Sequence, residues 1–191
     1  MIAALTFALA LAPSLALAPS LAALPDDSVY LLESKSFVDQ AGAKRSLDVH
    51  RGRPVLLAMF YATCPSVCPR LIADVQRSLA LLSEAERNEV RVVLVSLDPE
   101  RDTPKVLAGV IETRGLDPKR TTLLTGSASD TRRLAAVLGV KYRDDGAGAI
   151  DHSSRIVVLD GLGRIADTKD GLGGSVTEIA AQVRRAVRPT R

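Results

Sequence analysis

Aromatic residues are scarce in this sequence, and they do not cluster with basic ones. The 191 residues include no tryptophan, three tyrosines and three phenylalanines. A nucleic-acid-binding surface usually combines clustered Lys and Arg with side chains that stack on bases. The formal net charge is only +3, and no run of basic residues is interleaved with aromatics. We therefore expect a mildly basic protein that does not bind nucleic acid.

Charged residues are absent from the first 24 positions, where the hexapeptide LAPSLA occurs twice in tandem. This composition predicts an export signal over residues 1–24, with Ser20-Leu21-Ala22 as the cleavage tripeptide. An uncleaved membrane anchor is the alternative, because about 20 apolar residues can span a bilayer. Pro13 and Pro19 would interrupt such a helix, and no basic residue precedes it. With either interpretation, the rest of the chain lies outside the cytoplasm.

The remaining residues, 25–191, have the composition of one globular domain. The whole chain is 47% hydrophobic, with 25 basic and 22 acidic side chains, which excludes a disordered, coiled-coil or collagen-like protein. Short apolar runs alternate with stretches of helical periodicity, and no internal boundary is visible. This alternation is typical of an α/β domain.

Two apolar segments predict the centre of the sheet. PVLLAMFY (54–61) is a continuous apolar run, as in strands buried on both faces, and VRVVLVSL (90–97) predicts a second buried strand. Between them, apolar residues recur at helical spacing at Leu71, Ile72, Val75, Leu79 and Leu82. Strand, helix and strand therefore form a crossover unit with parallel strands.

Other segments complete the predicted fold. A polar segment, 33–48, predicts an N-terminal hairpin with its turn at 39–42. Helices are expected at 104–114, with Thr103 as the cap before Pro104, at 129–138, with capping residues among 127–130, and at 175–187. A second hairpin is expected from 155–160 and 164–168. The order of elements predicts a thioredoxin-like α/β fold: a central mixed sheet flanked by helices, with an N-terminal β-hairpin.

Both cysteines of the chain lie in the segment FYATCPSVCPRL (60–71), between the first central strand and its crossover helix. This position is the carboxyl end of the sheet, where open α/β folds place their sites. Because Pro69 has no N–H group, it belongs in the first helical turn. The helix should begin near Ser66 or Val67, with Cys68 in its first turn and Cys64 in the loop. A helix N-terminus should lower the pKa of these thiols.

Three uses of the cysteine pair are open at this point. A structural disulfide across so short a loop would stabilise the protein by only about 2 kcal/mol in the chain-entropy model. A redox-active pair is a second interpretation, although the three intervening residues differ from the two of the common dithiol motif. A metal site is the third. An additional ligand elsewhere in the chain would favour the metal site.

Histidine is the residue that could supply this ligand, and the chain has two. We expect His50, which lies among polar residues, to be an exposed loop residue. His152 directly precedes an apolar strand and should lie at the edge of the sheet. Two sulfurs and one imidazole suit monovalent copper, whereas zinc usually takes a fourth ligand. Asp151 or Asp98 could complete such a site or orient the histidine.

Several segments, in this order, resemble the Sco/SenC copper proteins of cytochrome c oxidase assembly. They lie within about residues 36–172 and are RGRPVLLAMFY, CPSVCP, VSLDPERDTP, LLTG and DHSSRIVVLDGLGR. The resemblance implies a thioredoxin-like domain that faces the periplasm or the mitochondrial intermembrane space. It also implies that Cys64, Cys68 and His152 are copper ligands. The DPERDTP segment is explained by turn and cap chemistry, and we assign it no ligand role.

The resulting functional hypothesis is a copper metallochaperone. It would deliver copper by ligand exchange, at an exposed loop, to the binuclear copper site of cytochrome c oxidase subunit II. Another copper chaperone is a further candidate partner, and we expect a monomer in the periplasm, either soluble or anchored. An enzyme is the alternative, a thiol-disulfide reductase with Cys64 and Cys68 as its redox-active pair, which would not need His152. A redox or copper sensor is the third hypothesis.

Overall fold

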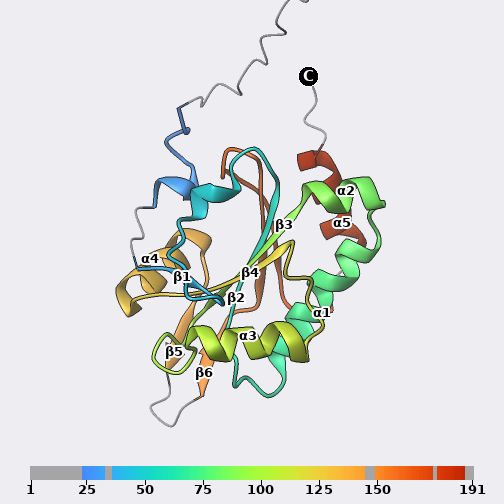
Figure 1. The fold of residues 1–191 in the computed structure, drawn as a ribbon. Coiled ribbons are helices and arrows are strands. Elements are labelled where there is room, and N and C mark those ends of the chain that lie inside the picture. Colours follow the sequence, from blue (N-terminus) through green and yellow to red (C-terminus); the bar gives the residue numbers. More distant parts are fainter. Residues whose placement is uncertain (1–22, 33–35, 145–148, 174–175, 188–191) are drawn as a thin grey trace, which may run out of the picture.

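A six-stranded mixed sheet forms the centre of the protein (Figure 1), in the strand order β1-β4-β3-β2-β7-β8. The structure is a computed structural model that describes residues 23–32, 36–144, 149–173 and 176–187. The central strands β4, β3 and β2 are parallel, while β1, β7 and β8 pair in antiparallel fashion. The strands of this sheet are β1 (Val38–Asp39), β2 (Val55–Phe60), β3 (Arg91–Ser96), β4 (Thr121–Thr125), β7 (Arg155–Leu159) and β8 (Ile165–Asp170).

Helices cover the sheet, and a short two-stranded ribbon lies apart from it at one end (Figure 1). The ribbon consists of β5 (Tyr142–Asp144) and β6 (Ile150–His152), which are antiparallel. The helices are α1 (Val67–Ala80), α2 (Glu84–Glu89), α3 (Pro104–Thr113), α4 (Ala128–Leu138) and α5 (Val176–Val187), with the 3-10 helices η1 (Val29–Leu31) and η2 (Leu47–His50). Within the described residues, no helix is both long and apolar enough to cross a membrane.

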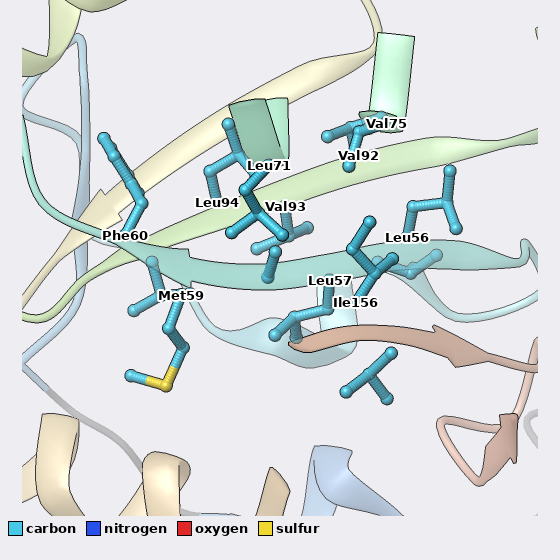
Figure 2. Close-up of a cluster of buried hydrophobic side chains, with 14 of the residues drawn as sticks. Leu56, Leu57, Met59, Phe60, Leu71, Val75, Val92, Val93, Leu94 and Ile156 are labelled. Atoms are coloured by element: carbon cyan, nitrogen blue, oxygen red, sulfur yellow. The ribbon is translucent and has the colours of Figure 1, made fainter. Parts of the chain in front are cut away.

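The core lies on both faces of β2, as its unbroken apolar sequence predicts. All six residues of β2 are buried. Figure 2 shows Phe60 on the same side as Leu94 of β3 and Leu71 of α1, while Met59 points to the opposite side. Successive side chains of a strand point to opposite faces, so both faces must be covered by helices.

Most of the predicted elements are confirmed, and so is the thioredoxin-like class. Helix α1 begins at Val67 with Cys68 in its first turn. Thr103 and Ser127 cap α3 and α4, each accepting a hydrogen bond from a backbone N–H three residues ahead. The crossover pairs β2 in parallel with β3, and 155–160 and 164–168 form the expected antiparallel pair. The sequence patterns did not predict β4, the ribbon strands β5 and β6, or the short helix α2.

The N-terminal hairpin is smaller than predicted. Its turn is present at 39–42, held by the Gly42 N–H donating to the Asp39 carbonyl. Only a single bridge joins Val38 to Lys44, because β1 takes β4 as its main partner. Residues 33–35 of the predicted hairpin, residue 175 of the closing helix and most of the predicted export segment lie outside the described residues.

His50 ends the 3-10 helix η2 and is half-buried, so the expectation of an exposed loop residue is wrong. Burial, and after it the positive charges of Arg91 and Arg45, lowers the pKa of His50 to about 4. A neutral imidazole in the folded state has a consequence for stability. Between pH 6.5 and 4 the unfolded chain binds a proton at this residue that the folded chain does not bind.

We therefore predict that His50 makes the protein less stable in mild acid. Its contribution to stability is complete above pH 6.5 and is lost as the pH falls towards 4. On going from pH 7 to pH 5, the wild type should lose roughly 1–2 kcal/mol more than His50→Gln, measured by urea unfolding at both pH values. Equal losses in the two proteins would contradict the assignment.

Candidate metal centre

Three side chains that could hold a metal ion meet at the carboxyl end of β2. The sulfurs of Cys64 and Cys68 and a ring nitrogen of His152 all lie within 4.8 Å of one another. Cys64 lies in the loop after β2, Cys68 in the first turn of α1, and His152 at the end of β6. The structure thus brings together all three residues that the sequence singled out.

The start of α1 fixes the relative position of the two sulfurs. A helix N-terminus has backbone N–H groups without an intrahelical partner, and a side chain normally accepts from one of them. The N-cap residue Ser66 makes no such bond with its side chain. Instead, the N–H of Cys68 donates to the sulfur of Cys64 at 3.2 Å. The Cys64 sulfur therefore acts as the capping acceptor of this helix.

Hydrogen-bond donors stabilise the thiolate form of Cys64. Burial alone would raise the pKa of its thiol, but the backbone N–H groups of Cys68 and Ser66 and the side chains of Cys68 and Tyr61 outweigh it. The net effect is a pKa below the usual value. This agrees with the effect that the sequence predicted for a helix N-terminus.

Cys68 behaves in the opposite way, which corrects the expectation that both thiols are acidified. Burial raises the pKa of Cys68 well above its usual range, and the nearby charges of Cys64 and Asp102 add to the effect. Its sulfur accepts one weak hydrogen bond, from the N–H of Tyr61 at 3.5 Å. The pair is therefore asymmetric, with Cys64 as the more readily ionised member.

The orientation of His152 suits a metal ligand. Its Nδ1 lies 3.1 Å from the carbonyl oxygen of Ser153, and its Nε2 lies 3.4 Å from the sulfur of Cys68. A carbonyl oxygen only accepts, so a proton on Nδ1 satisfies it. Nε2 then keeps its lone pair and points it towards the sulfurs, in the arrangement common for metal-bound histidine.

The two sulfurs are less accessible than a loop position implies. Cys64 is 6% exposed and Cys68 is 2% exposed, so the expectation of an exposed loop is wrong for Cys64. The reason is that its sulfur turns inward to cap α1. His152 is only half-buried, and an open hollow of about 360 Å³ beside it is lined by Lys141, Tyr142, Arg143, Asp151, His152 and Ser153. The histidine is the accessible side of the centre.

Neither candidate carboxylate belongs to the three-residue group. Asp98 forms an ion pair with Arg101, and Asp151 is exposed and precedes His152 on β6, so the two side chains point to opposite faces of the ribbon. Sequence reasoning missed another carboxylate, Asp102. It is fully buried and accepts hydrogen bonds from Ser96 Oγ at 2.6 Å and from the Ala62 N–H at 3.0 Å. The DPERDTP segment therefore supports the loop that carries Cys64.

Tyr61 is a second residue that sequence reasoning missed. Its ring packs edge-on against the His152 ring, with centroids 5.8 Å apart and an interplanar angle of 78°. Its position directly before the cysteine loop, as the last aromatic residue of a buried run, was the only signal available.

Comparison with known proteins places the chain in a family. The model of the SCO1/SenC family matches residues 30–188. The chain belongs to the SCO1/SenC family. This assignment confirms the resemblance seen in the sequence motifs, and the match extends over the whole central sheet and α1 to α5.

Individual relatives are distant in sequence but similar in fold. A Stutzerimonas stutzeri protein named as a copper-binding protein is 28% identical over 134 residues. The alignment covers 64% of this chain and 60% of that relative. Bradyrhizobium japonicum ScoI, solved with copper bound, is 26% identical with a TM-score of 0.62, covering 79% of this chain and 96% of ScoI. BsSco is described as a member of the Sco family of cytochrome c oxidase assembly proteins that contains a disulfide switch. It is 24% identical with a TM-score of 0.72, and the match covers 83% of this chain and 94% of BsSco.

The capping role of Cys64 gives a prediction for the reduced, metal-free protein. Cys64→Ala removes the acceptor of the Cys68 N–H, whereas Cys64→Ser supplies a hydroxyl oxygen at the same place. The alanine variant should be less stable than the serine variant by about 1 kcal/mol in urea unfolding. Equal stability of the two variants would show that the sulfur does not cap α1.

Proposed function

We propose that this protein is a copper metallochaperone that holds one copper ion with Cys64, Cys68 and His152. The observation that carries the proposal is the convergence of two sulfurs and one imidazole nitrogen within 4.8 Å, from segments far apart in the sequence. Soft thiolates select monovalent copper, and imidazole accepts copper in either oxidation state. The copper-bound structure of ScoI, from the same family, supports the choice of metal.

Zinc is less suitable for this donor set. Structural zinc sites take four protein ligands, and catalytic ones take three with an open water position. The candidate group contains only three ligands among the described residues, and the nearby Asp98 is paired with Arg101. Two thiolates and one imidazole, without a carboxylate in the group, match the low coordination number of monovalent copper.

The cargo would pass to the binuclear copper site of cytochrome c oxidase subunit II. The description of BsSco as an oxidase assembly protein of this family supports the recipient. In this proposal transfer begins at His152, because the imidazole is half-buried while both sulfurs are buried. A thiolate of the recipient would displace the imidazole first, and exchange at Cys64 and Cys68 would follow without release of free copper. Another copper chaperone would load the site from the same side.

Export to the periplasm is part of the proposal. Residues 1–24 would form a cleaved signal or an anchor, and residues 25–191 would form the functional domain. The first described residues, drawn in blue in Figure 1, lie at the end of the molecule opposite β5 and β6. The Val29 N–H donates there to the Gly163 carbonyl in the β7–β8 turn. The proposed copper site therefore lies at the opposite end of the molecule from the point where the described chain begins.

A thiol-disulfide reductase is the second candidate function, favoured by the asymmetric cysteine pair. The more acidic Cys64 would attack a disulfide of the recipient and form a mixed disulfide. Cys68, after losing its proton, would then attack Cys64, so that the recipient leaves with two thiols and the pair becomes a disulfide. The disulfide switch described for BsSco supports this chemistry. A redox or copper sensor would use the same residues.

Copper binding provides the direct test. The reduced protein should bind one copper per chain, and Cys64→Ser, Cys68→Ser and His152→Ala should each weaken binding, on the order of 100-fold or more, because a chelating ligand is lost. His50→Ala, which changes the other histidine of the chain, is the control and should bind like the wild type. The measurement is competition with a copper chelator. Retention of wild-type affinity by both cysteine variants would contradict the ligand set.

His152→Ala also separates the chaperone from the reductase. It removes a copper ligand but leaves both sulfurs at the start of α1, so thiol-disulfide exchange with a model disulfide should change little. In cells at limiting copper, a chaperone with this substitution should leave the oxidase inactive, with partial recovery when copper is added. Normal oxidase activity with His152→Ala, together with lost activity in Cys64→Ser, would favour the reductase instead.

A further inference from the structure

A crevice with an apolar floor lies between α1 and the loop that joins α3 to β4. Its volume is about 330 Å³, within the usual range of small-molecule sites in proteins. Figure 2 shows Val75 of α1 beside Val92 of β3, on the side of the sheet opposite Met59. The apolar lining consists of Ile72, Val75, Leu79, Val92, Leu94 and Leu116.

The length of the crevice follows from the residues of α1 that line it. Ile72, Val75 and Leu79 have the spacing of one helix face. At a rise of about 1.5 Å per residue, Ile72 and Leu79 are about 10 Å apart along the helix, roughly the length of an extended eight-carbon chain. Ile72 also lines the small cavity beside Cys64 and Cys68, so this end of the crevice points towards the candidate copper site.

Two arginines line the other end of the crevice, near the end of α1. Arg87 Nη1 donates to the carbonyl of Leu82, just after α1, at 2.9 Å. Arg120 Nη1 donates to the Arg87 carbonyl at 3.2 Å, and Arg120 Nε pairs with Asp117 at 2.6 Å. Among the described residues, Nη2 has no hydrogen-bond partner in either arginine. These two groups can therefore donate to an anion in the crevice.

The surroundings of the two arginines are positively charged. Arg53 and Arg91 both donate to the carbonyl of Asn88 in α2, at 3.1 and 2.9 Å. Burial, and after it the positive charge of Arg53, lowers the pKa of Arg91, against the opposing effect of Glu89 and Asp117. Four guanidinium groups thus outweigh two carboxylates at this end of the crevice, which attracts anions.

We propose that this crevice binds a linear aliphatic carboxylate, the anion of a medium-chain fatty acid. The alkyl chain would lie along α1 on the apolar floor, and the carboxylate would accept hydrogen bonds from Arg87 and Arg120. A neutral apolar molecule would leave the arginines unused, and a small anion would leave the floor uncovered. The crevice contains none of the three candidate copper ligands, so this site does not depend on the proposed function.

The test is an NMR titration of the reduced, metal-free full chain, with isotope-labelled methyl groups and octanoate as the probe. Octanoate should bind with a Kd on the order of 0.1–1 mM, as expected for a ligand of this size. It should shift the methyl resonances of Ile72, Val75 and Leu116, but not that of Met59 on the opposite side of the sheet. Octanol has the same chain without the charge and should bind more weakly, and acetate should not bind.

Substitutions separate the two parts of the site. Arg87→Gln keeps a donor for the Leu82 carbonyl but removes the charge, so octanoate should bind about three- to fivefold more weakly while octanol is unaffected. Arg185→Gln is the matched control on α5, where the side chain bonds to Gln182 and does not line the crevice. Ala80→Trp, at an exposed position on the edge of the crevice, should block both ligands.

Three results would overturn the inference: octanol binding at least as tightly as octanoate, methyl shifts outside the crevice only, or unchanged octanoate affinity in folded Arg87→Gln. The comparison of octanoate, octanol and acetate uses the wild type, so it decides the question even if Arg87→Gln does not fold. Binding of octanoate without binding of copper would contradict only the proposed function. Binding of copper without binding of octanoate would contradict only this inference.

Discussion

The antiparallel pairing of β2 with β7 is the constraint on which the candidate site depends. Ala58 lies opposite Ile156 in this register, so the end of β2 lies beside the start of β7. The cysteine loop follows β2, and His152 comes three residues before β7. Both strands are buried at the centre of the sheet, where a change of register would turn their apolar side chains to the wrong face. The hydrophobic core therefore fixes the distance between the cysteines and the histidine.

The local chemistry of the cysteines then depends on where α1 begins. Because the Cys64 sulfur caps the helix, it is drawn out of solvent and into contact with N–H donors, while Cys68 is buried behind it. The same arrangement makes one thiol more acidic and the other less acidic than usual. A pair of this kind serves a metal chaperone and a thiol reductase equally well, and the nearby imidazole favours the chaperone.

The three candidate ligands differ in their exposure to solvent. The sulfurs are covered, whereas the β5–β6 ribbon holds His152 at the surface beside an open hollow. Ligand exchange that begins at the imidazole would keep the copper bound to two thiolates until a recipient is in place. Tyr61 directly follows β2, and its ring packs edge-on against that of His152 in β6.

The sequence alone determined the class of fold and the identity of the three candidate ligands. Continuous apolar runs identify central strands, helical spacing identifies α1, and Pro69 places the helix start, because each of these signals is local. The ribbon strands β5 and β6 have only three residues each, too few for a periodic signal, and the main partner of β1 depends on the whole sheet. Burial is likewise not a local property. Only the tertiary structure decided that Cys64 is covered, that Cys68 is the less acidic thiol, and that Tyr61 and Asp102 support the site, because these features arise from contacts between segments distant in sequence.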